Sequence, residues 1–64
     1  MNLELECFLA VVKVQKVHLE LELKDYEFAM QFATPEMEAF DILLGIIENL
    51  YEEIKYLETK LNEV

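Results

Sequence analysis

The chain has almost none of the residues from which catalytic and metal sites are usually built. Its 64 residues include no serine, and Cys7, His18 and Gly45 are each the single residue of their type. Without serine no Ser-His-Asp triad can form, and one cysteine with one histidine supplies neither a disulfide nor a four-ligand zinc site. The sole glycine lies in a predicted helix, where it cannot shape a calcium loop. We therefore expect no enzymatic activity, no metal and no cofactor.

Arginine is also absent, and positive charge is scarce. Five lysines stand against fourteen acidic residues, which gives a formal net charge of -9. This charge repels a phosphate backbone, and the clusters of Arg and Lys that nucleic-acid readers use are missing. The sequence shows no run of about 18 uncharged apolar residues and no basic secretion signal. We expect a cytoplasmic protein that binds neither nucleic acid nor a membrane.

Apolar residues are what the chain has in excess. They make up 55% of a sequence that is short enough to form one domain, residues 1–64. A chain of about this size buries only ~60% of the surface that its unfolded form exposes. Because disulfides and metals are not at hand to supplement the core, oligomerisation is the other source of stability. We therefore predict a homodimer or a higher homo-oligomer.

The pattern after Thr34 predicts one long helix over residues 35–63. Thr34 is placed to accept a hydrogen bond from the first turn, and Pro35 fits the first helical position. Apolar residues then recur at alternating spacings of three and four, which is the pattern of a coiled-coil seam. The predicted oligomer interface consists of Phe40, Leu43, Ile47, Leu50, Ile54, Leu57 and Leu61.

Two explanations of this stripe stay open. It is either the core face of a helix that lies on its own sheet, or the seam between two chains. Residues 40–51 are apolar around most of the helix circumference, which favours burial on more than one side. Gly45 costs roughly 1 kcal/mol relative to alanine inside a helix, and close approach of another backbone would explain why it is tolerated.

The first half of the chain alternates between apolar and polar residues, as half-buried strands do. The alternation runs through residues 17–23 and 26–32, and Lys24-Asp25 between them is a candidate two-residue turn. Residues 2–14 favour a third strand because of their valines, with a short helix as the alternative. The predicted fold class is α+β: a two- or three-stranded antiparallel β-meander over residues 2–33, packed against the long C-terminal helix.

This strand register gathers carboxylates on one face of the sheet. Glu22 and Glu27 become cross-strand neighbours, which destabilises the pair by up to about 1 kcal/mol. Such a face is either simply solvated or a binding site for a basic partner. The predicted partner-binding residues are Glu4, Glu6, Glu20, Glu22 and Glu27.

These features predict a non-enzymatic, acidic, homo-oligomeric protein-binding module. It would act as a regulator or inhibitor of a basic or nucleic-acid-binding protein, with nucleic-acid mimicry as one route. The alternative is a purely structural homo-oligomeric assembly subunit. A third hypothesis is an accessory subunit or fragment whose core is completed by a different chain.

Overall fold

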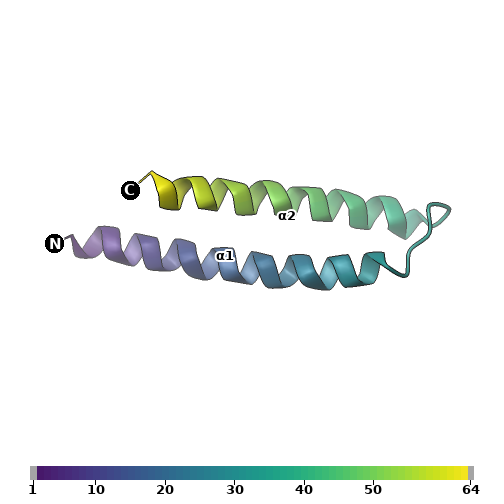
Figure 1. Cartoon of the computed structure of the whole chain (residues 1–64), viewed down its shortest axis with the longest axis horizontal. Helices are drawn as coiled ribbons and strands as arrows, with labels where there is room; N and C mark the ends of the chain where they lie inside the picture. The colour runs from purple at the N-terminus through teal and green to yellow at the C-terminus, as the bar shows by residue number, and fades with distance from the viewer. Residues whose placement is uncertain (1, 64) are drawn as a thin grey trace.

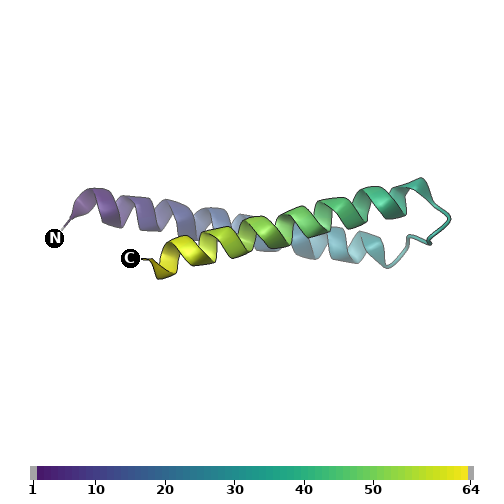
Figure 2. The ribbon, with the colours of Figure 1, turned by 90° about the horizontal axis from the view of Figure 1, so that it is seen from above.

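A computed structural model describes residues 2–63 as two long antiparallel helices. Helix α1 spans Leu3–Met30 and helix α2 spans Glu38–Asn62, with residues 31–37 connecting them. The helices lie side by side, and the start of α1 and the end of α2 are at the same end of the molecule (Figure 1). Seen from above, they cross at a shallow angle (Figure 2). The chain is a helical hairpin with extents of 54 × 16 × 12 Å.

The predicted β-meander is wrong, since the described part of the chain contains no strand. The fold class is all-α instead of α+β. Lys24 and Asp25, predicted to form a tight turn, lie inside α1, and residues 3–14 adopt the helical alternative. The β-hairpin and its sheet faces therefore do not exist in this protein.

The alternation that suggested strands comes from two apolar stripes on opposite sides of α1. The inner stripe faces α2 and consists of Leu9, Val12, Lys16, Leu19, Leu23, Tyr26 and Met30, all buried or half-buried. The outer stripe faces water and consists of Leu3, Cys7, Ala10, Val14, Val17, Leu21 and Phe28, all exposed. Within each stripe the residues are three or four positions apart, as on one side of a helix. Each residue of the inner stripe, however, lies two positions from a residue of the outer stripe. Interleaved, they give a period of two between residues 17 and 23.

Local sequence supports the helical conformation of α1. The helix begins after Asn2, whose side-chain Oδ1 accepts a hydrogen bond from the Leu5 amide at 3.2 Å. Glu4 and Glu6 in the first turn place negative charge near the positive end of the helix dipole. Each valine costs less than about 0.7 kcal/mol relative to alanine in a helix. Packing of the inner stripe against α2 outweighs that cost.

Helix α2 begins three residues later than predicted, at Glu38 rather than Pro35. The preceding residues form a turn in which the Met37 amide donates to the Thr34 carbonyl oxygen at 2.9 Å. A hydrogen bond from the Thr34 side chain lowers the pKa of the Glu36 carboxyl below its usual range. Thr34 therefore stabilises the connection between the helices and does not cap α2.

The core of the hairpin is small. Four residues, Leu23, Ile47, Leu50 and Ile54, pack together between the helices, and each is at most 9% exposed. Leu19, Tyr26, Met30 and Ile46 are partly buried against this cluster. Among the described residues, no large side chain is fully enclosed. Each helix thus buries one face, and the opposite face stays in water.

Gly45 lies on the side of α2 that faces away from α1. Beyond its own stretch of helix, no atom lies within 4 Å of the place that a Cβ would occupy. Close packing inside the chain therefore does not explain this glycine.

Replacing Gly45 with alanine is expected to raise the free energy of unfolding by about 1 kcal/mol, because glycine loses more backbone entropy in a helix. Urea unfolding followed by circular dichroism measures the change. A loss of stability, or a lower mass in solution, would show that another chain approaches the backbone at Gly45.

Candidate functional site

The five predicted partner-binding carboxylates do not form one patch. Glu6, Glu20 and Glu27 lie in one column along α1, since their spacings are multiples of seven residues. Glu4 lies on the other side of the outer stripe, and Glu22 lies further round the helix, next to the inner stripe. The predicted sheet would have placed these carboxylates on one face, whereas the helix places them on different sides. The flat acidic array on which nucleic-acid mimicry depended is not present in the described chain.

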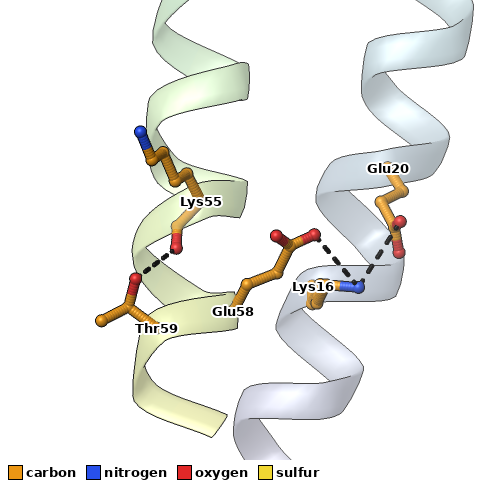
Figure 3. Close-up of polar contacts among 5 residues, drawn as sticks. All are labelled: Lys16, Glu20, Lys55, Glu58 and Thr59. Carbon is orange, nitrogen blue, oxygen red and sulfur yellow. Dashed lines mark hydrogen bonds and ion pairs between the residues drawn. The ribbon is translucent and has the colours of Figure 1, made fainter. Parts of the chain in front are cut away.

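Glu27 contacts the other helix directly, whereas Glu20 pairs with Lys16 of its own helix, and Lys16 in turn contacts α2. The Nζ of Lys16 lies 3.6 Å from Oε2 of Glu20 and 3.6 Å from Oε1 of Glu58, as Figure 3 shows. The Tyr51 hydroxyl donates to Oε2 of Glu27 at 2.7 Å. This hydrogen bond and the negative charge of Glu27 raise the pKa of Tyr51 above its ordinary value. Glu20 and Glu27 therefore support the hairpin, while their role in partner binding stays a prediction.

Lys16 occupies a position of the inner stripe where the other members are apolar or aromatic. Its side chain is 24% exposed and reaches from α1 toward Glu58 of α2 (Figure 3). Partly solvated ion pairs contribute only about 0.2–1 kcal/mol each. A charged residue inside a helical seam also favours one alignment of the two helices, because its charge has an opposite partner only in that alignment. Lys16 therefore links α1 to α2 through its ion pair with Glu58.

The predicted oligomer interface of α2 faces α1 of the same chain. Ile47, Leu50 and Ile54 are buried there, and the other members, Phe40, Leu43, Leu57 and Leu61, are half-buried. The stripe therefore forms an intramolecular core, with α1 in place of the expected sheet. A role for these residues between chains stays a prediction.

Two grooves run along the seam between the helices. One is lined by Gln15, His18, Leu19, Glu53, Tyr56 and Leu57, and the other by Glu20, Leu23, Tyr51, Ile54, Lys55 and Glu58. Both are wide open to solvent and enclose no cleft. Within residues 2–63, no three His, Cys, Asp or Glu side chains gather in a way that could hold a metal ion. The grooves give no argument for catalysis.

The outer stripe of α1 is the feature that the sequence reasoning missed. Its large members Leu3, Val14, Val17, Leu21 and Phe28 are each 52–71% exposed. Val11, beside the stripe, is also exposed. At the rise of an α-helix, the stripe runs about 38 Å along α1. An exposed apolar face of this length, interrupted at Lys24, is typical of a protein-interaction site.

Helix α2 carries no second stripe of this kind. Its side opposite α1 is polar or small, with Asp41, Gly45, Glu48, Glu52, Lys55, Thr59 and Asn62. Its large exposed apolar and aromatic residues, Ile42, Leu44, Tyr51 and Tyr56, lie in two separate columns. This asymmetry places the candidate interaction surface on α1.

No known protein family, curated protein or solved structure matches this chain. Within residues 2–63, neither helix is long and apolar enough to cross a membrane. Function is therefore inferred from the surfaces of the two helices alone.

Proposed function

We propose that this chain is a non-enzymatic assembly module that joins protein chains through the outer stripe of α1. The observation that carries the proposal is a helix with two apolar faces, of which α2 covers one. Removing apolar surface from water is favourable by roughly 25 cal/mol per Å². A partner helix that covers the outer stripe would therefore be held mainly by the hydrophobic effect.

The dimensions of the hairpin support a role as a subunit. Its accessible surface is 5126 Å², whereas a compact monomer of the same mass would expose about 4300 Å². Its radius of gyration is 15.2 Å, against about 11 Å for a compact domain of this length. The surplus of roughly 800 Å² is what one partner contributes to a standard protein interface. A structural homo-oligomeric subunit is the form of the proposal that these values favour.

A second candidate is a heteromeric module that binds a basic helix. Acidic residues flank the outer stripe on both sides: Glu6, Glu20 and Glu27 on one, Glu4 and Asp25 on the other. A partner helix with an apolar face and basic edges would match both the stripe and its rim. In this form the stripe supplies contact area, and the acidic columns select the charge of the partner.

We also propose that the protein acts in the cytoplasm. Cys7 is exposed on the outer stripe and is the sole cysteine of the chain. A lone exposed thiol fits a reducing compartment, in which thiols are kept reduced.

Replacing both Val14 and Leu21 with glutamate tests the assembly role. Each buried Val or Leu side chain contributes about 1.5–3 kcal/mol, so the double variant is expected to weaken association about 100-fold or more. Both residues lie outside the inner stripe, and the helix content should persist. Sedimentation equilibrium over a range of concentrations gives the mass, and circular dichroism gives the helix content.

The matched control adds the same two charges at exposed polar positions of α2, by Asn49→Glu and Asn62→Glu. This control should keep the mass of the unmodified chain. The proposal fails if the unmodified chain is a monomer at every concentration, or if the outer-stripe variant keeps the multimeric mass.

A further inference from the structure

We propose that the outer stripe is covered by the outer stripe of a second copy of this chain, packed antiparallel, with Val14 of each copy opposite Val17 of the other. The inference rests on the proposed assembly role and gives that role its partner and geometry. The two α1 helices would form the centre of the dimer. The two α2 helices would lie outside, with their polar sides in water.

The period of the outer stripe points to a helical occupant. From Leu3 to Phe28 the positions recur at alternating spacings of four and three residues, and Lys24 is the single charged position among them. A heptad pattern sustained over three to four repeats is the signature of a coiled coil. The inner stripe and the stripe of α2 already cover each other. The matching surface left free on a second copy is its own outer stripe.

The outer stripe is complementary to itself when it is turned end for end. With the symmetry axis between Val14 and Val17, Ala10 faces Leu21 of the second copy, and Leu3 faces Phe28. Cys7 faces Lys24 of the second copy; every other layer pairs one member of the stripe with another, and the smallest side chain meets a large one. In an antiparallel coiled coil, each a-type position of one helix faces a d-type position of the other, so this arrangement of layers can form.

Charges beside the stripe favour this direction. Lys13 and Glu20 lie in the same column along α1. Antiparallel pairing sets Lys13 of each copy beside Glu20 of the other, which gives two attractive pairs per dimer. It also brings Lys24 of each copy beside Glu6 of the other. The dipoles of the two helices then oppose each other favourably.

A parallel pair in register lacks these contacts. Lys24 would face Lys24 of the second copy within the apolar seam, and Glu20 would lie beside Asp25 of the second copy, which repels it. In the antiparallel pair, like charges meet only toward the ends, where Glu6 approaches Glu27 and Glu4 approaches Asp25. Lys24 lies at the same ends and offsets part of that repulsion.

The two ends of the stripe carry the most exposed large apolar side chains of the described residues. Leu3 is 71% exposed and Phe32, just beyond α1, is 67% exposed. The rings of Phe28 and Phe32 pack edge to face, with centroids 5.2 Å apart and an interplanar angle of 72°. Antiparallel pairing lays Leu3 of one copy on this aromatic pair of the other. Both exposed ends are thereby covered at once.

Disulfide trapping tests the direction and the register. In a Cys7→Ala background, one chain carries Val14→Cys and another carries Val17→Cys. The two chains are mixed in a glutathione redox buffer, and the products are separated by mass. A disulfide requires Cα atoms within about 7 Å, so a crosslink reports direct opposition. We expect the 14–17 heterodisulfide in at least tenfold excess over either homodisulfide.

A second pair, Ala10→Cys mixed with Leu21→Cys, repeats the test, and circular dichroism shows that each variant remains helical. Asn49→Cys mixed with Asn62→Cys, at exposed polar positions of α2, should give no preferred product. Homodisulfides of each chain alone, or a statistical mixture, would overturn the antiparallel pairing while a multimeric parent chain leaves the assembly role intact. A monomeric Cys7→Ala parent would overturn both.

Discussion

Replacing Leu50 with alanine is expected to lower the free energy of unfolding of the hairpin by about 2–5 kcal/mol, the range for truncating a leucine in a packed core. Leu50 is 6% exposed and packs in the cluster that joins the helices. Small domains have a total stability of only about 5–15 kcal/mol, and a two-helix core has little in reserve. Urea unfolding followed by far-ultraviolet circular dichroism measures the loss.

The matched control for this experiment is Ile42→Ala, which removes apolar atoms from a side chain of α2 that is 55% exposed. It should change the free energy of unfolding by no more than about 0.5 kcal/mol. Equal effects at Leu50 and Ile42 would contradict the placement of the stripe of α2 against α1.

Reversing the charge of Lys16 is expected to lower the free energy of unfolding by about 1–3 kcal/mol. In Lys16→Glu, two attractive contacts of about 0.2–1 kcal/mol each become repulsions of similar size. The new carboxylate would lie in the seam between Glu20 and Glu58, which Lys16 now joins at 3.6 Å each. The same unfolding measurement gives the value.

A compensating change separates this effect from a general cost of altering the seam. Adding Glu58→Lys to Lys16→Glu restores an opposite pair between the helices, and it should recover part of the lost stability in a double-mutant cycle. Lys55→Glu is the control, because the Lys55 side chain points away from this pair (Figure 3). No recovery would mean that Lys16 does not act through Glu58.

Helix α2 could be predicted from the sequence because it has one apolar stripe. The apolar residues outside this stripe form no second stripe, so the spacing of Ile47, Leu50 and Ile54 indicates a helix directly. The start was misplaced, since Thr34 and Pro35 have the residue types of a helix start but belong to the connecting turn. The turn forms because the chain reverses direction to pack α2 against α1. The helix preferences of the individual residues do not indicate this reversal.

Helix α1 was missed because its two stripes together imitate a strand. One signal in the sequence does separate the two: Glu6, Lys13, Glu20 and Glu27 repeat every seven residues. A repeat of seven puts all four on one side of a helix, whereas in a strand they would alternate between faces. Charged residues, rather than apolar ones, therefore carry the period of this segment.

The interaction surface could not be identified before the fold was known. In the predicted strands, the residues of the outer stripe belong to the buried face of the sheet. Only the position of α2 shows that they are exposed to water. The predicted acidic patch depended on the fold in the same way, because Glu22 and Glu27 are neighbours only across a β-hairpin. Five residues apart on a helix, they point to different sides.

We infer that the inner stripe of α1 packs within one chain and that the outer stripe packs between chains. Isotope-filtered nuclear Overhauser spectroscopy on a mixture of 13C-labelled and unlabelled chains tests this most directly. We predict intermolecular contacts between the methyl groups of Val14 and Val17, and none between Leu23 and Ile54. Intermolecular contacts from Leu23 to Ile54 would contradict the claim, because they would show that the core of the hairpin forms between two chains.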